Sequence, residues 1–363
     1  MSGGFLYDHK LIENLTAMGD EITIVSIPWK KYPLNLLDNF SSHLMKKLLS
    51  SGFDVLLEDE LNHPSLFLLN GWLHTKTKIP IIGIVHHLRI NEKHSKLLSP
   101  VYRVIEKKYL TSLDGVICNS KTTRQSVENL LARKINHVVA YPAADHFEKG
   151  FSVLVDRNRR ESGSPLRILF IGNLIPRKGL HILIQALSLI REAEWKLTVV
   201  GSKDFEPDYA KNVIQLAGRL LPAAKVNFTG ALTDEELLRT YHENDLLVVP
   251  SNYEGFGIVY LEAMLLGLVP VGTTGGAAGE IITDQVNGFL VPPDDPTALS
   301  FVLKKLIKNP NILAEVQKNA AQRAKEFPSW RQSAEISRNF LIEMIKFQTG
   351  NLGTDYRKER GLT

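Results

Sequence analysis

Two acidic residues, Glu254 and Glu262, stand eight positions apart around a glycine-rich turn. Residues 245–249 (DLLVV) form a short apolar run ended by Pro250, so Glu254 is expected at the carboxyl end of a parallel strand, where open α/β sheets bind ligands. Apolar residues at helical spacing from Ile258 onward place Glu262 about two turns along the following helix. The glycines would leave backbone amides at the helix start directed at an anion.

Two carboxylates that frame an amide-donating helix start suit a ligand with hydroxyl groups at both ends and a charged middle. A nucleotide-sugar is such a ligand. The residues alone leave another interpretation open, in which Glu254 is a helix-start charge stabilised by the macrodipole and Glu262 is a solvated surface residue.

A second group of candidate residues lies near the start of the second half of the chain. Arg177 and Lys178 follow an apolar run at residues 166–171, and Gly179 begins the next helical pattern. Two adjacent cations at a strand-to-helix turn can neutralise a diphosphate whose charge grows as it leaves. Charge-assisted hydrogen bonds of this kind are worth roughly 1.5–3 kcal/mol each. The alternative is a pair of surface loop charges.

The elements that position these residues alternate between apolar strands and amphipathic helices, as in parallel sheets covered by helices. A polar stretch from Glu148 to Pro165 interrupts the alternation and predicts a linker. We therefore predict an α/β protein with one Rossmann-like domain over residues 1–160 and a second over 165–328. A helix over 329–348 would cross back to the first domain, and the polar residues 349–363 would form a flexible tail.

The predicted elements follow in chain order. Strands are expected at residues 21–27, 54–59, 79–85, 115–118, 137–141, 166–171, 195–200, 226–228, 245–249 and 268–271. Helices include residues 95–110, 180–191, 208–221 and 234–243, with three more from Pro296 to about Phe347.

The amino end departs from this pattern. Gly3 and Gly4 lead directly into an amphipathic helix that ends at Gly19. A phosphate-binding turn needs a strand before its glycines, and none precedes these two. Either the start codon has been placed too late, or the first half lacks an opening strand.

Composition bounds the class of protein. The 363 residues, 44% of them hydrophobic, are enough for two domains that each bury a core. Neither a signal-peptide pattern nor an apolar run of about 18 residues is visible, which indicates the cytoplasm or its membrane face. The single cysteine, Cys118, lies in an apolar run and is interpreted as a core residue rather than a reactive thiol.

The charge is uneven along the chain. Residues 1–161 hold 21 Lys and Arg against 17 Asp and Glu, so the whole net charge of +4 falls in the first half. Such residues are usually solvated, yet they would also favour peripheral contact with an anionic lipid surface. The basic helix at 95–110 would suit a membrane face, unless its apolar residues are core. Nucleic acid is not expected as a partner, because aromatic residues are not interleaved with the basic ones.

Taken together, these motifs resemble the retaining glycosyltransferases of family 4. The resemblance covers nearly the whole chain and implies the GT-B fold, two Rossmann-like domains with parallel sheets facing across a cleft. The first domain would bind mainly the acceptor, and the second the nucleotide-sugar, expected to be UDP-linked. The resemblance is carried by the Gly3-Gly4 opening, Arg177-Lys178 after GNLIP, Glu254 and Glu262 around EGFGIVYLEAM, Pro270, and the Gly275-Gly276 turn.

The resemblance also implies roles for residues of the second half. Arg177 and Lys178 would hold the donor diphosphate. Glu254 would meet the sugar hydroxyls near the reacting carbon, and Glu262 would hydrogen-bond the ribose. Backbone amides would come from Phe256, Gly257 and Ile258.

In the first half, the resemblance assigns His86 a place beside the donor sugar. His86 ends the apolar run at 79–85 and is followed by His87, where the family usually has a small or polar residue. Gly4 would approach the phosphates or the acceptor with its backbone.

The implied reaction keeps the anomeric configuration through front-face attack, and the leaving phosphate helps to take the acceptor proton. The protein then mainly positions groups and stabilises charge. No carboxylate pair of the kind that a double-displacement glycosidase needs is recognisable. No Asp-x-Asp stands at a strand end of the second half, so no metal or other cofactor is expected.

The acceptor, a small molecule or a lipid, is not identified by the sequence. Two other functions stay open: a nucleotide-sugar-binding protein with little transferase activity, and a sugar-nucleotide epimerase on the same fold. The polar residues at strand ends of the first half could touch the acceptor or equally cap helices; they are Asp59, Glu60, His63, Arg89, Asn119 and Ser120.

Overall fold

The computed structural model describes residues 3–50, 52–92, 98–147, 164–190, 194–348 and 350. The chain divides into two compact units. The N-terminal unit comprises residues 8–141 and 331–363, and the C-terminal unit residues 1–7 and 142–330. Most of the predicted linker at 148–165 and of the predicted tail at 349–363 lies outside the described residues.

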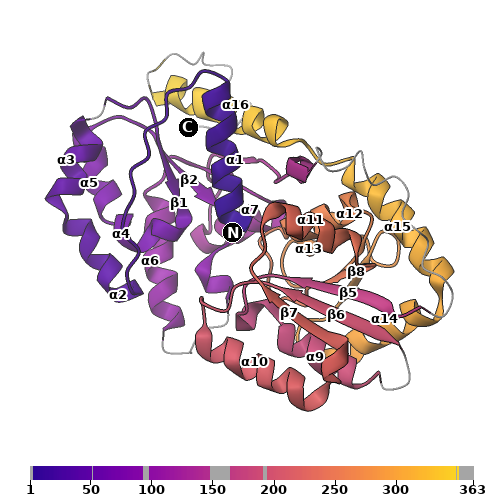
Figure 1. Ribbon diagram of the computed structural model, residues 1–363. Coiled ribbons are helices and arrows are strands. Elements are labelled where there is room, and N and C mark those ends of the chain that lie inside the picture. The colour runs from indigo at the N-terminus through magenta and orange to yellow at the C-terminus, as the bar shows by residue number, and fades with distance from the viewer. Residues whose placement is uncertain are drawn as a thin grey trace. The chain divides into compact units, whose positions relative to one another are not determined.

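The C-terminal unit is built on a six-stranded parallel sheet in the order β10-β9-β8-β5-β6-β7. Numbered along this unit alone, the strand order is 6-5-4-1-2-3, as in a Rossmann fold. All strands are parallel, and the direction in which successive strands are added to the sheet reverses between β5 and β8. Figure 1 shows helices α9 and α10 on one face of this sheet and α11, α12 and α13 on the other. The strands are β5 (Leu166–Ile171), β6 (Trp195–Val200), β7 (Val226–Gly230), β8 (Leu246–Val248), β9 (Val269–Thr273) and β10 (Phe289–Val291).

The helices of this unit match the predicted alternation. Their buried sides are apolar, as in α9, where six of nine residues are buried. The helices are α9 (Leu180–Ser188), α10 (Pro207–Leu220), α11 (Asp234–His242), α12 (Ile258–Leu265), α13 (Ala278–Ile281), α14 (Pro296–Lys308) and α15 (Pro310–Ala324), with the 3-10 helices η4 (Asp145–Phe147), η5 (Pro176–Lys178) and η6 (Ala223–Lys225).

The N-terminal unit has a four-stranded parallel sheet in the order β1-β2-β3-β4. Strand β2 is buried along its whole length, as expected for an inner strand of a parallel sheet covered on both faces. Cys118 is fully buried on β3, which confirms the prediction that it is a core residue. The strands are β1 (Leu56–Asp59), β2 (Ile81–Val85), β3 (Gly115–Cys118) and β4 (His137–Val139).

Helices surround this smaller sheet. Helix α1 begins at Gly3 and belongs to the N-terminal unit from Asp8 onward. Helix α16 contributes its residues from Arg331 onward, and Arg338 donates two hydrogen bonds to Asp20 within the unit. The helices are α1 (Gly3–Ala17), α2 (Tyr32–Asn35), α3 (Ser42–Ser50), α4 (His63–Leu66), α5 (Leu69–Lys76), α6 (Ser99–Thr111), α7 (Lys121–Leu131) and α16 (Trp330–Gln348), with η1 (Leu36–Phe40), η2 (Glu60–Asn62) and η3 (Arg89–Asn91).

The strand predicted at residues 21–27 is wrong. This segment, all of it described, joins neither sheet. Val25 and Ile27 still pack against the core, whereas Ile24 is 65% exposed. The apolar residues of this segment thus mark one side that packs on the core of the unit. A strand also needs a neighbouring strand with which its backbone can pair, and the sequence pattern does not show whether one is there.

The helix expected at 95–110 corresponds to α6 with its N-cap residue Leu98, while residues 95–97 lie outside the described residues. The apolar residues from Leu98 onward divide between two environments. Ile105 and Tyr109 are buried, as a core interpretation requires. Leu98, Val101 and Val104 are 48%, 48% and 56% exposed, so for these three residues that interpretation is wrong. Across the described residues, no helix combines the length and the hydropathy needed to cross a bilayer.

Candidate active site

Arg177, Lys178 and Glu254 lie at the switch point of the C-terminal sheet. Strand β5 leads into η5, which carries Arg177 and Lys178, and β8 leads into the loop that carries Glu254. These two strands pair with each other, so their carboxyl ends are adjacent. Ligands of doubly wound sheets bind in the crevice at this position. The two sequence-predicted groups therefore meet at one place.

The side chains form a compact charged cluster. Lys178 Nζ donates to Glu254 Oε1 at 2.6 Å, and Ser251 Oγ donates to the same oxygen at 2.6 Å. Arg177 Nη1 stands 3.8 Å from Glu254 Oε2 and donates to the carbonyl of Tyr253 at 2.9 Å. Two cations and one hydroxyl thus surround one carboxylate, which excludes the interpretation of Glu254 as an isolated helix-start charge.

This surrounding fixes the protonation state of Glu254. Glu254 is 6% exposed, and burial by itself would raise the pKa of its carboxyl. The charges of Lys178 and Arg177, with the hydrogen bonds from Lys178 and Ser251, outweigh burial and lower the pKa to about 2. Burial also lowers the pKa of Lys178, and Arg177 adds to that effect, while Glu254 opposes it. Glu254 is consequently a stable anion, and a weak base, at neutral pH.

Two glycines hold the loops around this cluster close together. Gly179 has φ +72°, and a Cβ at this position would stand 2.1 Å from the carbonyl oxygen of Pro250. Gly276 has φ +86°, and its Cβ would stand 2.1 Å from the carbonyl oxygen of Glu254. Both positions need the left-handed conformation and the missing side chain that only glycine offers without strain.

Glu262 lies on α12 in a separate set of contacts. It is 5% exposed, so it is not the solvated residue of the alternative interpretation. Tyr241 Oη donates to Glu262 Oε2 at 2.5 Å, and His146 Nε2 stands 3.2 Å from Oε1. The Nε1 of Trp330 in turn donates to His146 Nδ1 at 3.3 Å. Sequence reasoning missed these partners because they come from distant parts of the chain.

The remaining predicted residues of this unit surround the start of α12. Phe256 and Ile258 have buried side chains, and Gly257 has φ +94° at the helix N-cap. Gly4 lies in the first turn of α1, and its neighbour Gly3 approaches α12, since a Cβ on Gly3 would stand 3.5 Å from Ile258 Cδ1. The glycine pair thus lies beside this helix start, although no strand precedes it among the described residues.

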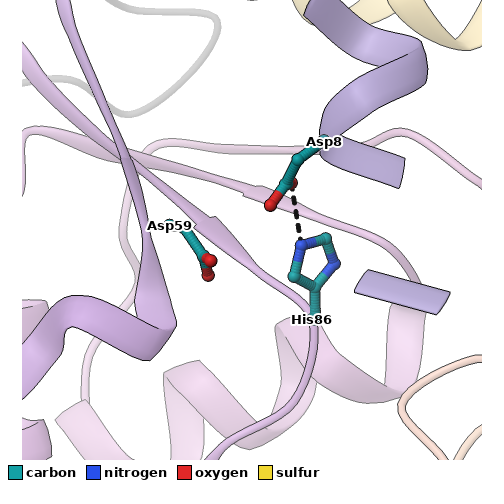
Figure 2. Close-up of side chains that lie close together, drawn as sticks. All are labelled: Asp8, Asp59 and His86. Carbon is teal, nitrogen blue, oxygen red and sulfur yellow. Dashed lines mark hydrogen bonds and ion pairs between the residues drawn. The ribbon is translucent and has the colours of Figure 1, made fainter. Parts of the chain in front are cut away.

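In the N-terminal unit, His86 follows β2 and contacts Asp8. His86 Nε2 and Asp8 Oδ1 are 2.9 Å apart, and Figure 2 shows the Asp59 carboxylate on the same side of the ring. His86 is 6% exposed. Burial disfavours the charged ring most strongly, but the hydrogen bond and charge of Asp8, then the charges of Asp59 and Glu60, raise the pKa of His86 above its usual value.

The other candidates at these strand ends have structural partners. His87 Nε2 lies 2.9 Å from Glu92 Oε1, and Asn119 donates to the carbonyl of His86 at 2.9 Å. Ser120 caps α7 by accepting from the Thr123 amide, so the capping interpretation holds for this residue. Asp59 likewise accepts from the Leu61 amide at 3.0 Å.

Two groups in the described part of the chain bring three possible metal-ligand atoms within 4.8 Å of one another. Within both groups the side chains already make protein contacts, and acidic clusters are common without an ion. We assign no metal to either, and independence from metal stays a prediction. The groups are Asp8, Asp59 and His86, and Glu60, His63 and Glu106.

Comparison with known families covers both units. Residues 155–326 match the family described as glycosyl transferases group 1, and residues 6–146 match glycosyltransferase family 4. An uncharacterized glycosyltransferase of Methanocaldococcus jannaschii is 34% identical over 173 residues, which are 47% of this chain and 43% of that protein. The D-inositol 3-phosphate glycosyltransferase of Corynebacterium jeikeium is 32% identical over 256 residues, 67% of this chain and 60% of that protein. The chain thus spans less than two thirds of the length of these relatives.

Solved structures share the fold at low identity. Sucrose-phosphate synthase from Thermosynechococcus elongatus superposes with a TM-score of 0.76 at 20% identity, over 95% of this chain and 94% of that one. Anabaena HepE, solved in complex with UDP and glucose, gives a TM-score of 0.71 at 19% identity, over 94% and 96%. With two parallel-sheet α/β units, a charged site at the Rossmann switch point and both family matches, the chain belongs to the family 4 glycosyltransferases of the GT-B fold.

Proposed function

We propose that the protein is a retaining hexosyltransferase that uses a UDP-linked sugar donor and requires no metal. The observation that carries the proposal is the meeting of Lys178 and Arg177 with Glu254 at the switch point of the C-terminal sheet. A diphosphate leaving group needs positive charge held in place before the reaction, and the cluster supplies it. His86 of the N-terminal unit is proposed as the group beside the donor sugar.

The geometry of Lys178 is compatible with a second anion. An ammonium group has three N–H donors, and the contact with Glu254 uses one of them. The others can bind phosphate oxygens while Glu254 keeps the amine in position. Arg177 adds a second cation, and its contact with Tyr253 fixes the loop.

The low pKa of Glu254 supports a role in binding rather than in proton transfer. A carboxylate with a pKa of about 2 that already accepts two short hydrogen bonds is a weak base and a weak nucleophile. It is suited to accept hydrogen bonds from sugar hydroxyls. This favours front-face transfer assisted by the leaving phosphate over a covalent intermediate on Glu254.

The choice of UDP rests on the family and on the HepE structures, one of which contains UDP and another UDP-glucose. Thermal unfolding with UDP, GDP and ADP tests it, because a ligand at a hundred times its dissociation constant adds about 2.7 kcal/mol of stability. We expect UDP to stabilise the protein most. Equal shifts with all three nucleotides would contradict the choice of base.

Transfer itself is tested with UDP-hexoses and a panel of acceptors in the presence of EDTA. The anomeric configuration of the product is read by proton NMR. We expect retained configuration and unchanged turnover with the chelator. UDP binding with neither donor hydrolysis nor transfer would indicate a nucleotide-sugar-binding protein, and an epimerised donor without any acceptor would indicate an epimerase.

We also propose peripheral membrane contact through α6. Leu98, at the N-cap of α6, and Val101 and Val104 within the helix recur at three-residue spacing and are exposed. Arg103, Lys107 and Lys108 lie on the same helix. Apolar side chains beside basic ones are the composition of helices that lie at an anionic membrane surface.

A further inference from the structure

The carboxylate of Glu262 is held from two sides by residues outside its own helix. Tyr241 Oη on α11 donates to Glu262 Oε2 at 2.5 Å, and His146 Nε2 on η4 stands 3.2 Å from Oε1. Glu262 is 5% exposed and Tyr241 is fully buried, so a turn of the carboxylate would disturb a packed interior. Each carboxylate oxygen thus has a protein neighbour that fixes where it lies.

The second ring nitrogen of His146 determines where the proton of the ring lies. Trp330 Nε1 donates to His146 Nδ1 at 3.3 Å, and an indole N–H can only donate. His146 Nδ1 is therefore an acceptor, and the neutral ring carries its proton on Nε2, the nitrogen that faces Glu262. Because of Trp330, His146 presents a donor rather than an acceptor to the carboxylate.

Further contacts hold the rings around Glu262 in place. Both carboxylate oxygens of Asp145 accept from the Trp330 backbone amide, at 3.1 and 3.3 Å. The centroid of the His146 ring lies 4.2 Å from that of the buried Phe147, and Phe147 lies edge-on to Tyr241 at 6.0 Å. The two partners of Glu262 are therefore parts of one packed group.

The members of this group come from distant parts of the C-terminal unit. Asp145 and His146 lie shortly after Pro142, where the chain returns to this unit, and Trp330 is the last residue before the chain leaves it. Trp330 is also the first residue of α16. The start of α16 is thus connected to Glu262 through a single histidine.

The carboxylate of Glu262 keeps acceptor capacity for a ligand. Its two oxygens together offer about four lone-pair sites, and Tyr241 and His146 each face one oxygen. The Glu262 side chain is not fully enclosed, since 7% of its surface is exposed. The 2′- and 3′-hydroxyls of a ribose are adjacent donors that match two carboxylate oxygens. A carboxylate whose plane is already set binds both without the cost of being ordered first.

We propose that His146 is a positioning residue of the donor site. Held by Trp330, it orients the Glu262 carboxylate so that both vicinal hydroxyls of the donor ribose are bound. The inference rests on the proposed function, because its ligand is the nucleotide of a sugar donor whose ribose Glu262 binds, as the family resemblance implies. It links ribose binding to the first residue of α16.

The experiment compares UDP with 2′,3′-dideoxy-UDP by titration calorimetry on the full chain. The two nucleotides differ only in the ribose hydroxyls, so the ratio of their dissociation constants isolates binding at those hydroxyls. We expect the parent protein to bind UDP at least about tenfold more tightly, the size of one lost hydrogen bond to a charged group. In His146→Phe the ratio should fall to about threefold or less, whereas a purely structural defect would weaken both nucleotides alike.

Two further variants serve as rescue and control. His146→Gln keeps an N–H for Glu262 and a carbonyl oxygen for Trp330, so it should restore most of the ratio. His181→Phe removes another half-buried histidine of the same unit, whose Nδ1 lies 2.8 Å from Tyr209 Oη, and should leave the ratio at the parental value. An unchanged ratio in His146→Phe, or an equal loss in His181→Phe, would overturn the proposal.

Tryptophan indole signals test the proposal in the parent protein, without any variant. The chain has four tryptophans, so selective 15N labelling gives a small set of indole N–H signals. Trp330 and Trp195 are matched, because both are buried in the C-terminal unit and each indole donates to its acceptor at 3.3 Å. UDP should shift the Trp330 signal more than dideoxy-UDP does and leave the Trp195 signal unchanged. Equal shifts of the Trp330 signal with both nucleotides would contradict the proposal.

The same titrations separate this proposal from the transferase function. UDP binding with an unchanged ratio in His146→Phe contradicts the role of His146 and leaves the transferase proposal intact. Binding of neither nucleotide by the parent protein contradicts the transferase proposal, and the role of His146 in ribose binding with it.

Discussion

Acidic side chains are buried near the carboxyl ends of both sheets, but their pKa values are shifted in opposite directions. In the C-terminal unit Glu254 is 6% exposed and its pKa falls to about 2. In the N-terminal unit Glu60 and Glu106 are at most 1% exposed, and the pKa of each rises to about 8. Burial acts in the same direction in all three, so the neighbours decide.

The neighbours differ in sign. Lys178 and Arg177 face Glu254, whereas Glu60 and Glu106 face each other. The backbone amide of Arg89 donates to Glu106 Oε1 at 2.6 Å, and the Arg89 guanidinium stacks on the rings of Tyr32 and Tyr102. One edge therefore holds an ionised carboxylate between two cations, and the other holds carboxyl groups that keep their protons at neutral pH. Each of the following predictions would break or sharpen this contrast.

The largest effect is expected from removal of the donor-side cation. Lys178→Ala should lower turnover by roughly 100-fold or more, the usual loss when a preorganised charge at the reacting group is removed. Steady-state transfer from a UDP-hexose measures it. Lys211→Ala, on the exposed side of α10, is the control and should keep parental turnover. Turnover within threefold of the parent in Lys178→Ala would rule out the assigned role.

A smaller effect is expected on stability as the pH changes. The folded N-terminal unit keeps protons on Glu60 and Glu106 that the unfolded chain, with its ordinary pKa of 4.5, has released. Its free energy of unfolding should fall as the pH rises from 6.5 to 8, by about 1.4 kcal/mol per pH unit for each such proton. His63, whose pKa is lowered by burial, opposes this trend only below pH 6.5.

The C-terminal unit should respond in the other direction. Since the pKa of Glu254 is lowered, its contribution is present above pH 4.5 and is lost as the pH falls toward 2. Urea unfolding is measured on two variants that each keep one tryptophan. The variant that keeps only Trp72 reports on the N-terminal unit, and the variant that keeps only Trp195 reports on the C-terminal unit. Glu60→Gln should reduce the pH dependence of the free energy of unfolding of the N-terminal unit, and Glu21→Gln should leave it unchanged. Parallel profiles for both units would contradict the contrast.

The smallest effect concerns the surfaces. Val101→Glu with Val104→Glu on α6 should reduce sedimentation with vesicles that contain anionic lipid several-fold, because two exposed apolar contacts are replaced by charges that anionic lipid repels. Phe301→Glu on α14 is the control, since Phe301 is 66% exposed in the C-terminal unit with Lys304 beside its ring. An equal loss in the control would show that α6 has no special role.

Much of the C-terminal unit could be predicted from the sequence, because its signals are local. The apolar runs at 166–171 and 245–249 gave strands that lie next to each other, so the meeting of Lys178 with Glu254 followed from the fold class. Ser251 belongs to the same stretch as Glu254, three positions before it, and could have been found there. The three-residue strand β10 was missed because so short an apolar run has no periodicity.

The N-terminal unit was harder to predict because its contacts span long distances. Asp8 and His86 are 78 positions apart, and no spacing in the sequence joins them. The C-terminal unit has one such pair as well, His146 and Glu262, which also lie far apart in the sequence. The segment at 21–27 had the residue types of a strand, but only the three-dimensional structure shows that it pairs with no neighbour.

The close approach of Gly179 to the carbonyl of Pro250 has a consequence for engineering. With no space for even a methyl group between the two loops, a loop imported from a relative would have to fit the contour of its counterpart. Donor preference would then be transplanted only when both segments, 172–179 and 250–257, are exchanged together.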